Sequence, residues 1–330
     1  MFRMIASRDR AAWFTLYLMG LGLLLTPIDM LLARFERRQY QRAAAPQKPI
    51  IFVCGAPRTG TTLVSQVLIK DLPVSYFSNL TSLFPRSPIV ANRLFGRLIG
   101  RKIAYHSYYS KTNHLSGPND AFYIWNRWMA EDETGMQCVL IESEIDEMVR
   151  FFGAYEEAFQ RPVLGKNNSL NTRANAVARA LPTAIFICMT RDPAYVAQSL
   201  LQARLEIQGD ISASLWVDNP DKSHVESGNY VQAVCDQVLY HERKIAEQQR
   251  LIGADRYWIV PYEEFCREPA RLVMRLYEEV WGEITEVDIF GSRIEPFEIA
   301  NKIRIDPKVF AEVQRTIARM RREERVSVGQ

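Results

Sequence analysis

Short apolar runs alternate along the chain with longer segments of helical periodicity. The apolar runs have the length and content of buried strands and lie at residues 50–54, 74–77, 163–164, 183–190 and 257–260. Helices are expected at residues 61–70, 118–130, 143–159, 172–181, 194–207, 229–251, 269–281 and 308–323. Strands that alternate with helices predict an α/β fold, a doubly wound parallel sheet flanked by helices and joined by right-handed crossovers.

The N-terminal segment breaks this alternation. Residues 11–28 carry no charge and approach the lower limit of about 17 residues for a membrane-spanning helix, and Asp29 then interrupts the run. Three interpretations are open: a spanning helix, an in-plane or re-entrant helix kinked at Pro27, and a helix packed on the domain. We expect an N-terminal hydrophobic, membrane-associated segment at 1–40, a linker at 41–48 and a folded domain at 49–330.

Composition narrows the classes of partner. The 330 residues are 48% hydrophobic, enough to bury a substantial core, and 41 basic against 38 acidic residues give a net charge of only +3. This charge is too small to imply nucleic acid as the main partner, and we expect none. The five cysteines are odd in number and widely spaced, which favours buried, reduced thiols. The sequence contains no CxxC pair and no histidine-rich cluster that would indicate a metal site.

A glycine-rich stretch, GAPRTGTT at residues 55–62, has the spacing of a phosphate-binding Walker A loop. A strand, a tight turn and a helix N-terminus direct backbone N–H groups and the helix dipole at an anion. Thr61 stands where a nucleotide hydrolase has lysine, so the loop lacks the side chain that reaches the β and γ phosphates. Arg58 supplies a cation inside the loop instead, and its guanidinium suits phosphate or sulfate oxygens.

A second anion site is expected after the apolar run 183–190. Arg191 follows this run at the carboxyl edge of the sheet, where α/β proteins bind ligands. Ser199 lies about two helical turns into the next helix. Together the two side chains suit a second phosphate, separate from the first.

Over about residues 49–282 the chain resembles the PAPS-dependent sulfotransferases, particularly bacterial and Golgi-type members. The resemblance implies a P-loop NTPase-like sulfotransferase fold, the donor 3′-phosphoadenosine 5′-phosphosulfate (PAPS), and no metal. It assigns the 5′-phosphosulfate loop to Pro57, Arg58, Thr59, Gly60, Thr61 and Thr62, the 3′-phosphate site to Arg191 and Ser199, and a further family element to Tyr262, Glu263 and Glu264. The family's K-G-x-x-G-x-W-K loop is missing, and the basic segment 301–304 is our candidate to replace its cofactor contact.

The implied reaction places negative charge on the donor's bridging oxygen and removes a proton from an acceptor hydroxyl. Arg58 and the backbone amides at 59–62 suit the first task. The glutamate that relatives often carry after the second strand is absent, because residues 78–80 read SNL. Lys166 resembles a family lysine near the transferred group. Histidine accepts a proton near neutral pH, and the candidate bases, in order, are His114, Asp120 and His106.

The acceptor is expected to be a hydroxyl of a saccharide or of a lipid-linked molecule. Its pocket could be aromatic, although core packing of a helix explains the same spacing, and the residues concerned are Phe122, Tyr123, Trp125 and Trp128. Two other functions fit part of the pattern: a P-loop kinase or NTPase with a degenerate loop, and a non-catalytic assembly protein that binds an adenosine phosphate. The missing Walker lysine disfavours the first, whereas the retained arginines bear little on the second.

Charges around the apolar run predict its orientation. Three arginines against one aspartate give +2 in residues 1–10, and five basic residues against one glutamate give +4 in residues 34–48. The positive-inside rule therefore favours a domain that faces the cytoplasm; the alternative is a type II protein of the Golgi lumen. Two N-x-[ST] sequons, at Asn79 and Asn167, lie where the active site is expected, which weighs against a secretory lumen.

Overall fold

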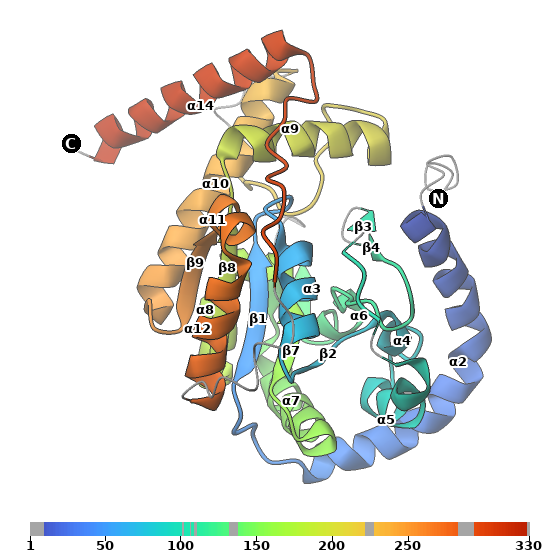
Figure 1. The fold of residues 1–330 in the computed structure, drawn as a ribbon. Helices are drawn as coiled ribbons and strands as arrows, with labels where there is room; N and C mark the ends of the chain where they lie inside the picture. The colour runs from blue at the N-terminus through green and yellow to red at the C-terminus, as the bar shows by residue number, and fades with distance from the viewer. Residues whose placement is uncertain are drawn as a thin grey trace.

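A five-stranded sheet forms the centre of the computed structural model, which describes residues 10–100, 102–105, 107–108, 111–131, 138–221, 228–282 and 294–328. Every pairing is parallel, and the strand order is β2-β7-β1-β8-β9 (Figure 1). The strands are β1 (Ile50–Gly55), β2 (Ser75–Tyr76), β7 (Val163–Lys166), β8 (Ala184–Thr190) and β9 (Tyr257–Pro261). The predicted α/β fold with a parallel sheet is therefore confirmed.

Helices cover both faces of the sheet because successive side chains of a strand point to opposite faces. Phe52 joins the apolar core on one face and Val53 the core on the other. The first face is covered by α7 (Ile145–Phe159), α8 (Ala174–Ala180) and α10 (Tyr230–Ile252), and the second by α3 (Thr61–Asp71), α11 (Tyr262–Arg267) and α12 (Pro269–Trp281). The two-sided cover explains why β1 and β8 read as nearly continuous apolar runs.

A further helical layer lies past the carboxyl end of β8 (Figure 1). There α9 (Pro193–Ala203) and α14 (Pro307–Val328) pack with α10 around their own apolar cluster. The chain continues from α9 into a π-helical turn, Arg204–Gln208. Before α14, residues 294–306 form neither helix nor strand, and this segment is hydrogen-bonded to Cys266 of α11 and to Gln198 of α9 (Figure 1).

The described cysteine thiols agree with the predicted reduced state. Cys54, Cys188, Cys235 and Cys266 are all free and buried. Cys54 and Cys188 lie opposite one another in neighbouring strands β1 and β8. Burial raises the thiol pKa of Cys54 well above its usual value and that of Cys235 to about 12. The thiols of Cys54 and Cys235 are therefore protonated at neutral pH.

The N-terminal helix is long and follows the outside of the domain. Helix α2 (Arg10–Arg42) contains Pro27 and contacts α5 (Pro88–Ile99), α7 and the hairpin of β3 (Ser107–Tyr108) and β4 (Lys111–Thr112). One side of it is buried on the domain, through Leu18, Asp29, Glu36 and Tyr40. By length and composition, residues 13–42 could cross a membrane, and only 11% of the most apolar window is buried. The helix thus lies on the domain along one side and leaves its other side exposed.

The helix predicted at 118–130 is wrong. Only Phe122–Trp125 is helical (α6), and β5 (Met129–Glu131) then pairs with β6 (Cys138–Leu140). Ala121 has φ 54°, a left-handed conformation that no helix continues through, and Pro118 forms a bridge with Ser78. Short helices that the sequence did not resolve are α4 (Asn79–Ser82), a 3₁₀ turn at Glu142–Glu144 and a 3₁₀ helix at Asn168–Thr172.

Candidate active site

The carboxyl ends of the parallel strands bring most candidate residues to one edge of the sheet. Strand β7 ends at Lys166, β1 leads into the glycine-rich loop, β8 is followed by Arg191, and β9 is followed by Tyr262. The strand order places the loop between Lys166 on one side and Arg191 and Tyr262 on the other. We refer to these two sides as the β7 side and the β8 side.

The loop after β1 contains two residues in the left-handed backbone region, one a glycine and one an arginine. Gly60 caps α3 in the left-handed region, with φ 92° and ψ 10°, and a Cβ there would lie 2.5 Å from Cδ2 of Tyr262. Arg58 is also left-handed, with φ 74°, a conformation uncommon for a non-glycine residue. Thr59 closes the turn by donating from Oγ1 to the Ala56 carbonyl at 2.7 Å. The loop therefore presents the N-terminus of α3, with its positive dipole end, to the carboxyl edge.

Two arginines and a serine are joined on the β8 side. Nε of Arg58 donates to Oγ of Ser199 at 2.8 Å. Arg191 donates from Nη1 to the Arg58 carbonyl at 3.1 Å. The two anion sites expected from the sequence are thus adjacent, and Arg58 rather than Arg191 bonds Ser199. A guanidinium pair and a hydroxyl beside a helix N-terminus form a strongly anion-attracting corner.

The segment 294–306 completes this corner. Arg191 donates from Nε to Oδ1 of Asn301 at 2.9 Å and from Nη2 to the Ala300 carbonyl at 2.7 Å. Its guanidinium also lies 4.7 Å from the ring centre of Tyr262, whose hydroxyl accepts the Ala300 amide proton at 3.2 Å. Burial lowers the pKa of Arg191 and raises that of Tyr262. The sequence pointed to 301–304 as a basic segment; in the structure this segment contacts Arg191 through Oδ1 of Asn301.

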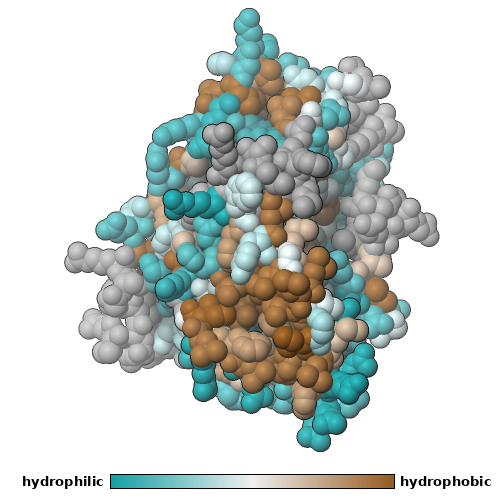
Figure 2. Space-filling view, turned by 90° about the vertical axis from the view of Figure 1, so that its right-hand side faces the viewer, coloured by the Kyte–Doolittle hydropathy of each residue, from teal (hydrophilic) through white to brown (hydrophobic). Residues whose placement is uncertain are grey.

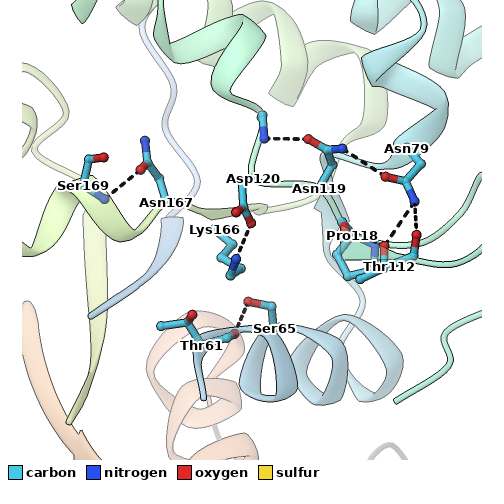
Figure 3. A network of polar contacts seen from close by, with 11 residues as sticks. Thr61, Ser65, Asn79, Thr112, Pro118, Asn119, Asp120, Lys166, Asn167 and Ser169 are labelled. Carbon is cyan, nitrogen blue, oxygen red and sulfur yellow. Dashed lines mark hydrogen bonds and ion pairs between the residues drawn. The ribbon is translucent and has the colours of Figure 1, made fainter. Parts of the chain in front are cut away.

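On the β7 side a buried ion pair faces the same loop. Nζ of Lys166 donates to Oδ1 of Asp120, with 3% of the Lys166 side chain and 16% of the Asp120 side chain exposed. Figure 3 shows the ammonium group between the Asp120 carboxylate and the first turn of α3 at Thr61. None of the described residues bonds the second carboxylate oxygen, Oδ2. The pair therefore holds one oxygen in place and leaves the other available.

An amide network fixes the loop that carries Asp120. Asn119 donates from Nδ2 to Oδ1 of Asn79 at 2.9 Å, and its own Oδ1 accepts the Ala121 amide proton at 2.8 Å (Figure 3). Asn79 in turn donates to the carbonyls of Thr112 and His114 at 3.0 and 2.8 Å. Sequence reasoning missed Asn119; the signal was its place in the GPND turn beside Asp120.

The other candidates lie in different environments. The His114 side chain is exposed, although its carbonyl belongs to the amide network. His106 lies outside the described residues. Among the aromatic set, Trp125 and Trp128 are buried in the sheet core and only Phe122 is largely exposed. Tyr123 donates its hydroxyl proton to Thr81 at 2.7 Å. The structure therefore brings together Asp120 and Lys166, and the tryptophans serve the core.

Most of the chain matches one known protein family. The model of the sulfotransferase family matches residues 49–281, about 70% of the chain. The chain belongs to the sulfotransferase family. It is an enzyme of that family, and its activity is sulfuryl transfer. Among curated proteins none matches the chain.

One solved structure with a TM-score above 0.5 agrees with the fold of this sulfotransferase. The sulfotransferase STF1 from Mycobacterium tuberculosis H37Rv is 13% identical, with a TM-score of 0.52, and the match covers 84% of this chain and 78% of that one. The sulfotransferase STF9 from Mycobacterium avium is 18% identical, with a TM-score of 0.47, over 86% of this chain and 70% of that one. At 13% identity the likeness to STF1 extends to the fold alone.

The sulfotransferase family implies PAPS as the donor, and the residues present fit its two anionic ends. Gly60 leaves the space that a side chain would fill between the loop and Tyr262. Arg58, Arg191 and Ser199 supply cations and a hydroxyl beside the N-terminus of α3. In contrast to a nucleotide hydrolase, this sulfotransferase has Thr61 where the lysine would lie, and Thr61 is buried.

Proposed function

We propose that this sulfotransferase moves a sulfuryl group from PAPS to a hydroxyl of a saccharide or lipid-linked acceptor, with Asp120 as the general base. The observation that carries the proposal is the arrangement about the α3 N-terminus. An arginine corner lies on the β8 side, and the buried Lys166 and Asp120 pair lies on the β7 side. Sulfuryl transfer requires a donor site and an acceptor site that adjoin each other.

The β8 side suits the donor. When bound, PAPS would supply the sulfuryl group and present a 5′-phosphosulfate and a 3′-phosphate. Arg58 and the first amides of α3, at Thr61 and Thr62, would stabilise the negative charge that develops on the departing phosphate oxygen. Arg191 and Ser199 would hold the 3′-phosphate, and Thr59, Gly60 and Tyr262 shape the loop between the two. No metal enters this scheme, because arginines and amides provide the positive charge.

The β7 side suits the acceptor. Oδ2 of Asp120 would accept the hydroxyl proton, while Lys166 fixes Oδ1 and so orients the carboxylate. Lys166 also brings a positive charge toward the first turn of α3, where it would offset charge on the sulfuryl oxygens (Figure 3). The amide network of Asn79 and Asn119 supports this arrangement by holding the loop. His114, ranked first from the sequence, is here the weaker candidate because its side chain is exposed.

The proposed place of action is a membrane surface, with the domain facing the cytoplasm. Support comes from the apolar helix α2 and from the two sequons. Asn79 and Asn167 are 4% and 1% exposed, and both side chains are hydrogen-bonded within the domain. A glycan on either side chain would disrupt these bonds, so this fold suits a compartment without N-glycosylation.

The donor is tested by calorimetry on the full chain in detergent. We expect 3′-phosphoadenosine 5′-phosphate to bind without Mg²⁺, and Arg191→Ala to weaken it. Binding of ATP with Mg²⁺, and not of the bisphosphate, would refute the proposal.

The base is tested by transfer assays on variants that still bind the bisphosphate. Asp120→Asn should lower kcat by roughly 10² to 10⁴, the usual contribution of a general base. His114→Ala is the matched control and should keep near wild-type kcat. The reverse order, with Asp120→Asn active and His114→Ala inactive, would return the role to His114.

A further inference from the structure

An apolar surface extends over two helices on the far side of β2. On α2 the exposed side chains include Leu23 and Leu24, each 77% exposed, and on α5 they include Leu98, which is 83% exposed. Figure 2 shows a continuous brown area on the face of the molecule that carries these helices. We call this surface the α2/α5 face; its large apolar members are Trp13, Tyr17, Met19, Leu23, Leu24, Ile28, Met30, Leu31, Phe35, Leu94 and Leu98.

The opposite side of α2 is bonded to the domain by two buried carboxylates. Asp29 is fully buried and accepts hydrogen bonds from Oγ of Ser87 at 2.7 Å and from the Arg86 amide at 3.2 Å. Glu36 is also fully buried, and its two oxygens accept the amide protons of Ile89 and Val90 at 3.1 and 2.9 Å. Because these donors lie at the start of α5, the two carboxylates of α2 cap the N-terminus of α5.

These bonds decide how α2 can meet a bilayer. A spanning helix exposes all its sides to lipid, which would leave Asp29 without partners in the hydrocarbon, an unfavourable position for a carboxylate. A helix that lies in the interface exposes one side only. The division of α2 into a bonded side and an apolar side matches the second arrangement.

The charges around the face are complementary to phosphate. The acidic residues of α2 are Asp29 and Glu36, both buried, and α5 has none, so no exposed acidic side chain lies on either helix. Arg93 and Arg97 lie next to the exposed Leu94 and Leu98 on α5. The two arginines line, with Arg161, a cavity of 630 Å³ that runs along β2. Basic residues beside an apolar surface are typical of binding to anionic lipid.

We propose that α2 and α5 together form an in-plane platform that seats on a bilayer containing anionic phospholipid, with Arg93 and Arg97 bonding lipid phosphates at its edge. The inference deepens the proposed membrane association by assigning its mode and adding α5 to it. The platform lies on the acceptor side of the sheet, since Leu80 and Leu115, next to the Asn79 network, pack beneath α2. A lipid-linked acceptor would then reach the β7 side from the membrane plane.

Vesicle binding of the full chain tests the platform. Vesicles of phosphatidylcholine with phosphatidylglycerol are compared with pure phosphatidylcholine by co-sedimentation. Leu94→Glu with Leu98→Glu should lower binding at least tenfold. The matched control is Leu251→Glu with Val326→Glu, two exposed apolar residues outside the face, which should leave binding unchanged. An equal loss of vesicle binding in both double variants, or no loss in either, would overturn the role of α5.

Charge and topology are tested separately. Arg93→Gln with Arg97→Gln should weaken binding to the anionic vesicles on the order of thirtyfold, with Arg315→Gln and Arg322→Gln on α14 as controls.

Tags with a protease cleavage site, placed at both ends of the chain, should be cleaved from the same side of sealed vesicles. A protected N-terminal tag would show a spanning helix and overturn the in-plane mode. Loss of a dimer in Leu94→Glu with Leu98→Glu, with vesicle binding intact, would assign the face to a second copy instead.

The bisphosphate titration separates the two proposals. Platform variants should bind 3′-phosphoadenosine 5′-phosphate as the wild type does, because their residues lie away from the arginine corner. Failure of the wild type to bind the bisphosphate, with vesicle binding preserved, would refute the donor assignment and leave the platform standing.

Discussion

Gly60→Ala tests whether the turn before α3 is shaped for the donor. At φ 92° and ψ 10° an alanine incurs about 1 to 2 kcal/mol for the left-handed backbone. Its Cβ would also lie 2.5 Å from Cδ2 of Tyr262, too close for any real contact, so the ring must move. The ring supports the Arg191 guanidinium at 4.7 Å. One methyl group should therefore disturb both stability and the arginine corner.

The magnitude follows from these two effects. A cation–π contact contributes about 0.5 to 2 kcal/mol, so displacement of Tyr262 should weaken bisphosphate binding by roughly 2-fold to 30-fold. Gly209→Ala is the matched control, since Gly209 has nearly the same backbone, φ 81° and ψ 8°, at the end of the π-helical turn. It should lose a similar backbone energy and keep full affinity.

Two assays read the outcome. Urea unfolding gives the stability of each variant, and calorimetric titration with 3′-phosphoadenosine 5′-phosphate gives the affinity. We expect Gly60→Ala to lose more stability than Gly209→Ala and to bind more weakly. Equal stability losses together with unchanged affinity in Gly60→Ala would show that Tyr262 and the loop do not shape the donor site.

Two further predictions concern buried ionisable groups. Burial lowers the pKa of His241 from 6.5 to about 4, so the unfolded chain takes up this proton at higher pH than the folded chain does. Stability should therefore fall by about 2 to 3 kcal/mol between pH 7 and pH 4.5, and urea unfolding of His241→Gln should show a smaller loss over that range. Glu36→Ala leaves two buried amide protons without acceptors and should lower the free energy of unfolding by about 2 to 4 kcal/mol, whereas Glu36→Gln, which keeps one acceptor oxygen, should lose less. Wild-type stability in Glu36→Ala would contradict the proposed bonding of α2 to α5.

The sequence was sufficient for the elements whose signal is local. Strands β1 and β8 lie between two layers of helices, so their apolar runs identify them directly. The glycine-rich loop could be placed because a strand, Gly55 to Gly60 and a helix start follow one another within a few residues. Arg191 and Ser199 could be placed for the same reason, as the strand end and the next helix are contiguous.

Long-range contacts account for what the sequence did not predict. Lys166 and Asp120 are 46 residues apart, and nothing local indicates that β7 brings the lysine to the GPND turn. Arg58 and Ser199 are separated by 141 residues, and their bond joins two sites that the sequence kept apart. Trp125 and Trp128 are three residues apart, a spacing that also occurs on a helix, but both are buried in the sheet core. Helix α6 is only one turn long, and the left-handed Ala121 precedes it.

The division of the carboxyl edge into two sides has a consequence for how such an enzyme changes its specificity. The loop of Asn79, Asn119 and Asp120 belongs to the connection between β2 and β7, whereas the arginine corner uses β1, β8, β9 and the segment 294–306. Under the proposed function, the base Asp120 and its supporting amides therefore come from one stretch of the chain, residues 77–131, whereas Lys166 and the proposed donor residues come from other parts of it. Exchange of that stretch between related chains, by recombination in nature or by grafting in the laboratory, could redirect sulfation to another alcohol while the donor half is inherited intact.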